Sequence, residues 1–425
     1  MRVGLDDPRQ FLLDLFQTAV AAADPHRVLP PGLPQGTDRR AIVIGAGKAA
    51  ASMASALEKN WAGELSGLVV TPYGHSEPCQ YIEVVEAAHP IPDAQGEQAA
   101  ARILELVSNR SAADLVICLL SGGGSALLSL PAPGITLADK QSVIEQLLHC
   151  GATIADINCV RKHLSRIKGG RLAQACFPAQ LITYAISDVP GDHPDVIASG
   201  PTVADATRST EALGILQRYD IKVRRHVLEW LQDSDSETLK ANDSAFVGSQ
   251  FHLIATAGQA LQAAARAARE AGVEVLLLGD NIEGEARELA RVQAAMALAQ
   301  RRDKPGMPPC LILSGGETTV TVTGRGRGGR NTEFLLSLAI ALQGTPGIYA
   351  LAADTDGIDG TQDNAGAVLT PASWARARAL GLDAESLLAD NDSYFFFAAL
   401  DELLVTGPTH TNVNDFRALL VLPGT

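Results

Sequence analysis

The sequence predicts an α/β protein with doubly wound, mostly parallel sheets. Short apolar runs alternate with stretches of helical periodicity, and in the first half of the chain these runs are residues 41–44, 67–70, 115–120 and 181–186. Runs that are apolar throughout indicate strands buried on both faces, as in parallel sheets covered by helices. The second observation that favours this class is that glycine-rich loops follow several of the runs directly.

Helix signals separate the predicted strands. Asp7 followed by Pro8 is typical of an N-cap and a first helical position, and apolar residues then recur at helical spacing as far as Val20. Thr136, with Asp139 three residues later, predicts the capping of a further amphipathic helix that ends near Gly151.

A mostly helical and polar passage at 205–244 is predicted to join two domains, residues 1–240 and 241–425. The last segment of the chain is a candidate for packing back on the first domain. The threonine and valine residues that alternate in 318–323 predict an antiparallel or edge strand. The second domain is expected to contain further strands at 252–255, 273–278, 310–313 and 348–352, and helices at 259–271 and about 283–301.

The composition bounds the class of protein. At 425 residues with 46% hydrophobic residues, the chain can bury a large core. Its net charge of −14 disfavours binding to nucleic acid or to an anionic membrane surface. No apolar run is long enough to span a bilayer, and Asp6 and Asp7 stand where a secretory signal would be basic, so we expect a cytoplasmic location. The six cysteines include no C-x-x-C pair, which disfavours a disulfide framework and a thiolate zinc site.

Three glycine-rich loops after predicted strands indicate anion binding. Glycine lets the backbone approach a ligand closely, so that consecutive N–H groups can point at phosphate oxygens. Because the protein is acidic as a whole, a site for an anionic ligand must be locally basic. The three loops are Gly45-Ala46-Gly47-Lys48, Ser121-Gly122-Gly123-Gly124-Ser125 and Ser314-Gly315-Gly316-Glu317.

The first loop admits three interpretations. Residues 45–50 match the dinucleotide fingerprint G-x-G-x-x-A, but no acid stands in residues 69–74, at the end of the next strand, to hold a ribose. Lys48, which the fingerprint does not require, is well placed to neutralise a transferring phosphoryl group. A tight turn with a surface lysine is the third interpretation, and the spacing alone does not choose among them.

A dense basic run lies at residues 158–171. Such a run is usually a solvated helix face. This one ends in Lys-Gly-Gly-Arg just before a strand, which favours recognition of a phosphate or carboxylate by Arg161, Lys168 and Arg171.

Two acidic loops follow predicted strands. Asp188 and Asp192 follow the strand at 181–186, at the end where α/β sheets place their ligands, so either could hold Mg²⁺ or accept a proton from a substrate hydroxyl. Asp354 and Asp356 form a second acidic loop that departs from the EF-hand pattern, which favours Mg²⁺ or hydroxyl binding over a calcium-sensor site.

Residues 323–330 interleave glycine with arginine before a predicted helix. Such a segment can form a flexible clamp in which a guanidinium grips a carboxylate or phosphate bidentately. RNA-binding RGG tails have a similar composition, but they are long and disordered. We therefore expect a folded anion site that includes Arg325, Arg330 and Asn331.

Taken in order, these motifs resemble the class II glycerate kinases over nearly the whole chain. The resemblance implies an enzyme that uses ATP and Mg²⁺ to phosphorylate the 2-hydroxyl of D-glycerate, giving 2-phosphoglycerate and ADP. It also implies two Rossmann-like domains with the active site in the cleft between them, the second domain being of the MOFRL type. The residues that carry it are 45–48, 120–126, 161–165, 168–171, 187–192, 198–202, 314–318, 328–331, 354–359 and 406–414.

Within this scheme we expect a division of roles. Lys48 and Arg330 offset the charge on the transferring group, and the loop at 121–125 cradles an anionic ligand. Asp192, with Asp188 as substitute, orients or deprotonates the hydroxyl or holds Mg²⁺. Metal or nucleotide binding is assigned to Asp354 and Asp356, and nucleotide binding to Gly315, Gly316 and Glu317.

Two other functions stay open. An NAD(P)H-dependent hydroxypyruvate reductase, a name that many members of the family bear, would oxidise nicotinamide without ATP. A sensor of sugar acids or nucleotides would keep the anion loops without turnover, and it would usually carry an appended domain that we do not find. Small-molecule partners are expected, and a monomer and a homodimer are equally compatible with the sequence.

Overall fold

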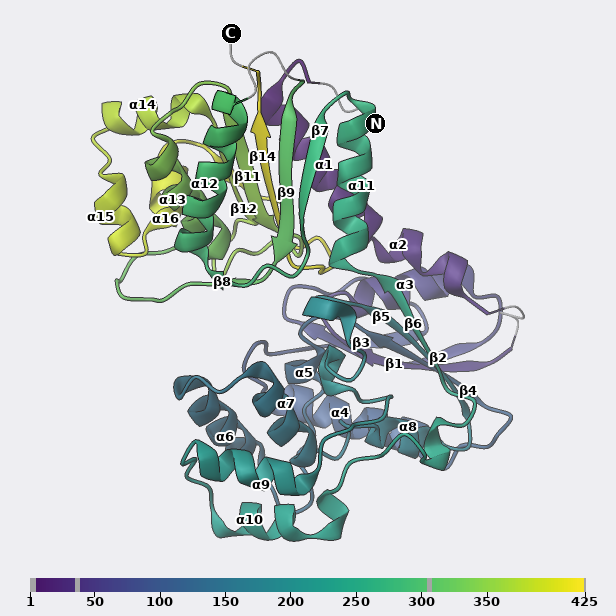
Figure 1. Ribbon diagram of the computed structural model, residues 1–425. Coiled ribbons are helices and arrows are strands. Elements are labelled where there is room, and N and C mark those ends of the chain that lie inside the picture. The colour runs from purple at the N-terminus through teal and green to yellow at the C-terminus, as the bar shows by residue number, and fades with distance from the viewer. Residues whose placement is uncertain (1–4, 35–38, 304–307, 424–425) are drawn as a thin grey trace. The chain divides into compact units, whose positions relative to one another are not determined.

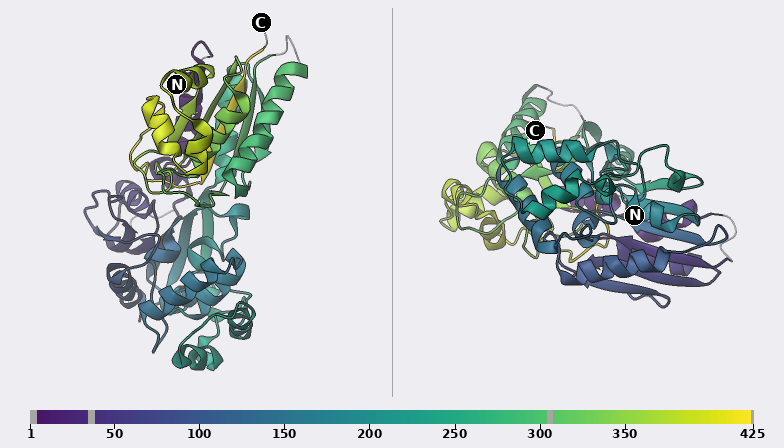
Figure 2. Two further views of the ribbon diagram at one scale, coloured as in Figure 1. Left: turned by 90° about the vertical axis from the view of Figure 1, so that its left-hand side faces the viewer. Right: turned by 90° about the horizontal axis from the view of Figure 1, so that it is seen from below.

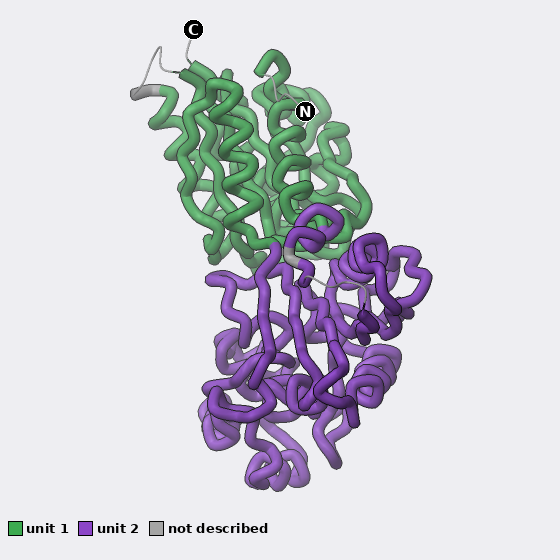
Figure 3. The backbone as a smooth tube through the Cα atoms, turned by 90° about the vertical axis from the view of Figure 1, so that its right-hand side faces the viewer, with its two compact units in different colours: residues 1–24, 255–425 green, residues 25–254 purple. Residues whose placement is uncertain are grey.

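The computed structural model describes residues 5–34, 39–303 and 308–423 (Figure 1). The chain divides into two compact units, which Figure 3 distinguishes by colour. Unit 1 takes residues 1–24 and 255–425, and unit 2 takes residues 25–254. The first four residues of the amino-terminal stretch lie outside the described ranges.

Unit 2 contains a six-stranded sheet of order β3-β2-β1-β4-β5-β6. The four pairings from β3 to β5 are parallel, and the order is that of a doubly wound dinucleotide-binding fold. The strands are β1 (Ala41–Ala46), β2 (Leu65–Pro72), β3 (Ile82–Ala87), β4 (Leu115–Leu120), β5 (Gln180–Ile186) and β6 (Gln250–Ala255).

Helices cover both faces of this sheet, as the apolar strands require. Helix α3 packs on β1, β2 and β4, and a core on the opposite face joins the strands to α4 and α8. A second core holds α6, α7, α9 and α10 together. The helices of unit 2 are α2 (Pro25–Val28), α3 (Ala50–Asn60), α4 (Ala94–Val107), α5 (Gly124–Leu127), α6 (Leu137–His149), α7 (Ile154–His163), α8 (Arg171–Cys176), α9 (Ser209–Arg218) and α10 (Arg225–Gln232).

The capping signals of the sequence are confirmed. The Thr136 side chain accepts the backbone N–H of Asp139, whose carboxylate accepts the N–H of Thr136, so a capping box starts α6. The Asp7 carboxylate accepts the N–H groups of Arg9 and Gln10 at the start of α1 (Pro8–Ala22). Both helices begin where a side chain satisfies N–H groups that have no partner inside the helix.

Unit 1 contains a mixed six-stranded sheet of order β13-β12-β11-β14-β9-β7. Only β7 and β9 pair in parallel, and the other four pairings are antiparallel, so the expectation of mostly parallel pairing fails for this sheet. The strands are β7 (Glu274–Gly279), β9 (Cys310–Gly316), β11 (Ile348–Asp354), β12 (Gly366–Leu369), β13 (Leu403–Leu404) and β14 (Asp415–Val421).

Helices again lie on both faces of the unit 1 sheet (Figures 1 and 2). Helices α1 and α11 cover one face, where the rings of Phe16 and Phe416 meet edge to face at 5.8 Å, and α12 and α13 cover the other. The remaining helices of the unit are α11 (Ala257–Glu270), α12 (Ala286–Asp303), α13 (Arg330–Leu342), α14 (Pro371–Ala379), α15 (Ala384–Ala389) and α16 (Ser393–Ala399).

The compact units differ from the domains expected from the sequence at both ends. The apolar face of α1 packs in unit 1, so the beginning of the chain groups with residues 255–425. The last segment forms β14, an interior strand of the same sheet, because its seven residues are all buried and pair on both sides. The strand expected to open the second series, β6, belongs instead to the sheet of unit 2.

The strand expected at 318–323 is much shorter in the structure. Only Thr318–Thr319 is extended and paired, as β10, in a parallel two-residue ladder with β8 (Gly284–Glu285). Beyond it the Glu285 carboxylate binds the N–H and hydroxyl of Thr321, and Val322 is 75% exposed. Alternating β-branched residues therefore do not suffice here, because no strand in the described part of the chain pairs with residues 320–323.

None of the helices in the described ranges is long and apolar enough to cross a membrane. All six cysteines are described and free.

Candidate functional site

The first two glycine-rich loops meet at the point where the strand order of unit 2 reverses. Strands β1 and β4 are neighbours, and their connections lead to opposite sides of the sheet, which is where open α/β sheets bind ligands. The N–H of Lys48 donates to the carbonyl of Gly122 at 2.8 Å, and the N–H of Ala49 donates to Ser121 Oγ at 2.9 Å. The two loops predicted from the sequence therefore form one surface.

Close approach explains the glycines of these loops. A Cβ on Gly47, whose φ is +143°, would overlap the Ser121 side chain, and a Cβ on Gly45 would overlap the carbonyl of Leu119. Gly123, at φ +80°, lies against His89 and Lys48. The glycines thus let two loops and two strands pack together, whether or not a ligand is bound.

The hydrogen bonds of the loops limit what they can offer to an anion. Because the N–H groups of Lys48 and Ala49 are bound inside the protein, this turn does not present them to a pyrophosphate. The N–H groups of Gly122 and Gly123, by contrast, make no hydrogen bond within the described part of the chain. The second loop is therefore the better source of backbone donors.

An open pocket of about 530 Å³ lies next to this surface in unit 2. Its wall is formed by residues 89–92, by residues 123–129 with α5, by one face of α6 and by Arg161 of α7. The volume is within the range of small-molecule sites.

Two basic side chains, Lys140 and Arg161, line this pocket, and a third, Lys168, lies next to them, with little to neutralise any of the three. Lys140 is 4% exposed and its Nζ has no hydrogen-bond partner in the described residues, while the fully buried Lys168 donates only to the carbonyl of Ala198, at 3.3 Å. Arg161 donates to the Asn158 amide oxygen at 2.8 Å. Within the ranges described, none of the three forms an ion pair.

The lowered pKa values of these three groups reflect how unfavourable their charged forms are in this buried position. Burial, followed by the charge of Arg161, lowers the pKa of Lys140 to about 7. Burial lowers the pKa of Arg161 to about 10 and, together with Lys140 and Arg161, lowers that of Lys168 well below its usual value. Buried cations without counter-ions are costly, so the site is suited to an anion that supplies them.

The rest of the basic run has partners inside the protein. Lys162 is paired with Asp205 at 3.1 Å and Asp195 at 3.3 Å. The Arg171 guanidinium binds the backbone carbonyls of residues 162, 235 and 237. Of the predicted anion-binding residues in this run, the structure thus brings Arg161 to the pocket wall, buries Lys168 next to it and engages Arg171 in holding a loop.

Sequence reasoning missed Lys140. It lies on the buried face of α6 with Val143 and Leu147, at positions i, i+3 and i+7. A lysine at an apolar position of an amphipathic helix is the signal that could have found it.

The acidic loop after β5 is a second feature at the same edge of the sheet. Asp188 and Asp192 are both partly buried, and Asp192 has a φ of +56° within a short turn at Pro190–Asp192. Strand β5 is the neighbour of β4, so this loop follows the strand next to the glycine-rich loop at 121–125.

In unit 1 the charged residues form a closed network. Arg330, at the start of α13, is bound by Glu317 at 2.7 Å, Asp354 at 2.7 Å and Asp415 at 2.8 Å. These carboxylates come from the ends of β9 and β11 and the start of β14, which meet at one edge of the antiparallel part of the sheet. Burial lowers the pKa of Arg330, but the three carboxylates, Asp415 foremost, leave it raised overall.

The N-terminus of α13 already holds an anion of the protein itself. The Asp359 carboxylate accepts the N–H groups of Asn331 and Thr332, each at 2.9 Å, and burial raises its pKa to about 6 against the effect of these bonds. The Asn331 amide donates to Asp415 at 2.8 Å. Asn331 is thus fully buried in the network rather than presented to a ligand.

The glycine and arginine segment is pinned rather than flexible, which corrects the expectation of a flexible clamp. Asn391 Oδ1 accepts the N–H groups of Thr323 and Gly324, and the Asp390 carboxylate accepts the N–H of Arg325 at 2.9 Å. A Cβ on Gly324 or on Gly326 would overlap the turn at 390–392. The glycines are needed because two backbones lie in contact, and the Arg325 side chain remains exposed.

The third glycine-rich loop is also shaped by packing. A Cβ on Gly315 would meet Leu261, and one on Gly316, at φ +119°, would overlap the backbone of Ile282. Glu317 is exposed and paired with Arg330. The structure thus accounts for these residues without the nucleotide that the sequence predicted for them.

The described ranges contain no group of three or more His, Cys, Asp or Glu side chains arranged to hold a metal ion. Asp354 binds Arg330 with one carboxylate oxygen and the N–H of Asp356 with the other. Mg²⁺ is commonly held by only one or two carboxylates together with substrate phosphates and water. Asp354 and Asp356, or Asp192 in unit 2, therefore fit Mg²⁺ as oxygen donors of a site that a substrate completes.

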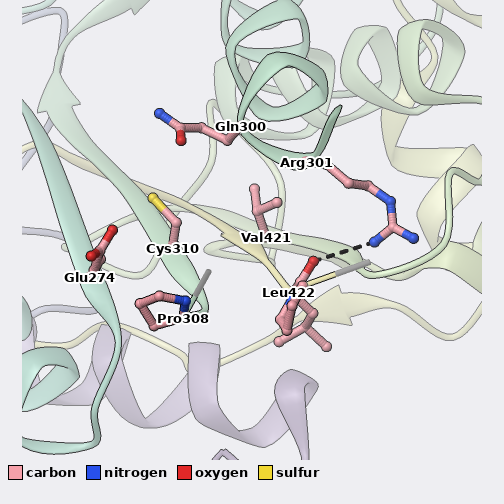
Figure 4. Close-up of a pocket in the computed structure, with 8 residues that line it drawn as sticks. Glu274, Gln300, Arg301, Pro308, Cys310, Val421 and Leu422 are labelled. Carbon is pink, nitrogen blue, oxygen red and sulfur yellow. Dashed lines mark hydrogen bonds between the residues drawn. The ribbon is translucent and has the colours of Figure 1, made fainter. Parts of the chain in front are cut away.

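A small pocket in unit 1 lies away from these motifs (Figure 4). It holds about 10 Å³ and is lined by Glu274 and Cys310, which begin β7 and β9, and by Val421, which ends β14. Arg301 closes one side by donating to the carbonyl of Leu422 at 3.3 Å. This is the end of the sheet opposite to the network around Arg330, so the pocket adds nothing to the site.

Comparison with known proteins places the chain in a family. A model of the domain of unknown function DUF4147 matches residues 11–232, and a MOFRL family model matches residues 310–415. The chain is 51% identical over 97% of its length to a putative hydroxypyruvate reductase of Agrobacterium vitis, covering 94% of that protein. It is 39% identical over 97% of its length to a D-glycerate 2-kinase of Thermotoga maritima, covering 98% of that protein.

A solved structure gives the same result. The crystal structure of a glycerate kinase from Thermotoga maritima matches 98% of this chain and 100% of its own, with a TM-score of 0.89 at 38% sequence identity. The resemblance noted in the sequence motifs is thereby confirmed, and this chain belongs to the class II glycerate kinase family.

Proposed function

We propose that this chain is an ATP-dependent glycerate 2-kinase that transfers the γ-phosphoryl group to the 2-hydroxyl of D-glycerate, giving 2-phospho-D-glycerate and ADP. Its class, a phosphotransferase with an alcohol acceptor, follows from the family. The observation that carries the proposal is the pocket of unit 2, in which buried cations without counter-ions lie beside the loops at Lys48 and Ser121–Ser125. Phosphoryl transfer depends on positioning and charge neutralisation, which such a site can supply.

The chain's own residues divide the work in this proposal. The Lys48 ammonium offsets the charge that spreads over the transferring group, and the loop at 121–125 holds an anionic ligand with backbone donors. Asp192, with Asp188 as substitute, accepts the proton of the 2-hydroxyl or orients it for attack.

Mg²⁺ is part of the proposal, held by Asp354 and Asp356 or by Asp192. When bound, it neutralises phosphate charge and helps to orient the phosphates. Arg330 already has three carboxylate partners, so we assign it to positioning Asp354 rather than to direct phosphate contact. This revises its expected role without excluding the residue from the site.

A hydroxypyruvate reductase is the second candidate, because relatives such as the one from Agrobacterium vitis carry that name. Two features of unit 2 favour the kinase. Residues Thr71 to Gly74, where β2 ends, include no carboxylate for a ribose, and the turn at Lys48 uses its N–H groups within the protein.

Initial rates distinguish the two functions. The purified protein is supplied with D-glycerate, ATP and Mg²⁺ while ADP release is followed, and in parallel with hydroxypyruvate and either NADH or NADPH. We expect ADP release that requires D-glycerate and no oxidation of nicotinamide. Oxidation of nicotinamide without glycerate-dependent ADP release would reject the kinase.

The expected partners are thus D-glycerate and a nucleotide. The cytoplasmic location and the choice between monomer and homodimer stay predictions, which cell fractionation and sedimentation would test.

A further inference from the structure

The pocket of unit 2 has two unlike walls. Lys140 and Arg161 line one side, with the fully buried Lys168 next to them, and Lys140 is the group that lacks any hydrogen-bond partner in the described residues. Ile91 and Leu148, which are 68% and 61% exposed, stand on the wall beside Pro90 and Ile144. An occupant that satisfies both walls carries negative charge at one end and an apolar surface at the other.

The amount of charge favours a polyphosphate over a carboxylate. A single carboxylate can neutralise one cation, whereas Lys140, Arg161 and the neighbouring Lys168 have no acid in ion-pair contact within the described ranges. Two acids lie close to these groups. Glu97 of α4 acts on Lys140, and Glu145 of α6 lines the pocket, but neither forms an ion pair with Lys140 or Arg161 in the described residues. A chain of two or three phosphates supplies several negative charges over the distance that separate cations require.

The size of the pocket also favours a ligand larger than a three-carbon acid. A volume of about 530 Å³ suits a drug-sized ligand, and a three-carbon acid would leave most of the apolar wall in contact with water. A nucleobase is flat and largely apolar on its faces, so it can cover Ile91 and Leu148.

We propose that this pocket is the nucleotide subsite, in which Lys140 binds the polyphosphate of a nucleoside di- or triphosphate and the 89–92 and 144–148 wall contacts its base. The inference rests on the proposed function, because a kinase of this family needs a phosphoryl donor. It assigns to unit 2 the nucleotide that the sequence had suggested for Gly315–Glu317 of unit 1.

Measurements of ligand binding test the inference without requiring catalysis. The full-length protein is titrated with ADP, and separately with inorganic tripolyphosphate, by calorimetry at pH 7. Lys140→Met is expected to weaken both by about tenfold or more, since a charge-assisted bond is lost. Lys140→Arg should restore most of the affinity, and Lys59→Met, the same change at an exposed lysine of α3, should leave it unaltered.

The apolar wall is tested by a variant at its exposed edge. Leu148→Ser should weaken ADP by about threefold, because it removes apolar contact area, and should not change the affinity for tripolyphosphate. Because Leu148 is largely exposed, this variant is expected to fold normally.

The outcomes separate the inference from the proposed function. If Lys140→Met binds ADP normally while the KM for D-glycerate rises, the pocket takes the acid substrate and the inference is rejected. It is also rejected if neither ligand is affected in a protein that circular dichroism shows to be folded. ADP binding that depends on Lys140 in a protein that does not phosphorylate D-glycerate would reject the proposed function alone.

Discussion

Replacing Lys140 with methionine is expected to stabilise the ligand-free protein while it weakens anion binding. The side chain is buried on α6, and its ammonium group has no hydrogen-bond partner among the described residues. Methionine has a similar length and no charge, so it can occupy the same space without the cost of desolvating an ion. Stability and binding should therefore change in opposite directions, which a purely structural lysine would not produce.

The pKa of Lys140 gives the magnitude. Its value falls from 10.5 to about 7, a difference of about 3.5 units, because of burial first and then the charge of Arg161, with Glu97 opposing. At about 1.4 kcal/mol per unit, this corresponds to roughly 5 kcal/mol for full protonation, and on the order of 4 kcal/mol at pH 7, where the amine is half protonated. Relaxation and water entry reduce this figure, so we expect a gain of about 1 to 4 kcal/mol in the free energy of unfolding.

Tryptophan fluorescence can follow the unfolding of unit 2, which contains Lys140. The three tryptophans are Trp61 and Trp230 in unit 2 and Trp374 in unit 1, so a Trp374→Phe background reports on unit 2 alone. Denaturant titrations at pH 7 then compare Lys140→Met with its parent and with Lys59→Met, for which we expect a change within about 0.5 kcal/mol. A loss of stability greater than about 1 kcal/mol on Lys140→Met would refute the reasoning, because the ammonium would then have a stabilising partner.

Three further predictions concern pH, catalysis and packing. Because the anion binds the protonated form of Lys140, the Kd for ADP should rise as the pH increases above about 7, and the slope should become smaller in Lys140→Met, where Lys168 remains. In the ligand-free protein, the unfolded chain binds more protons than the folded one between pH 7 and 10.5, so stability should increase over that range. A flat profile in either titration would contradict the assigned pKa of Lys140. Lys48→Met should reduce the turnover number by at least about a hundredfold with an unchanged circular dichroism spectrum, and retained turnover would remove Lys48 from the mechanism. Gly326→Ala should destabilise unit 1 by about 1 to 3 kcal/mol in chemical denaturation, because its methyl group would overlap Asp392, whereas a neutral effect would show that the segment is as flexible as its composition suggests.

Local signals in the sequence predicted local structure well. The capping box at Thr136 and the N-cap at Asp7 each depend on residues two or three positions apart, and both are present. The strands followed by glycine-rich loops were also found, because a run buried on both faces leaves few alternatives.

Long-range pairing could not be predicted from the same signals. Arg330 and Asp415 are 85 positions apart in the sequence. No local sequence pattern shows that three carboxylates form ion pairs with this arginine, which was expected to bind phosphate. In the same way, the sheet on which α1 packs and the interior position of β14 depend on which sheet offers a complementary apolar face. Lys140 was missed for the opposite reason, since its local context is an ordinary amphipathic helix and its importance appears only when Arg161 and Lys168 lie beside it.

Identification of the product tests the central claim most directly. The protein is incubated with D-glycerate, ATP and Mg²⁺, and the phosphorylated acid is assigned by phosphorus and proton NMR. We predict 2-phosphoglycerate in an amount equal to the ADP formed. Formation of 3-phosphoglycerate would contradict the assigned position of the reacting hydroxyl, and the absence of any phosphoglycerate from a folded protein that binds ADP would contradict the kinase itself.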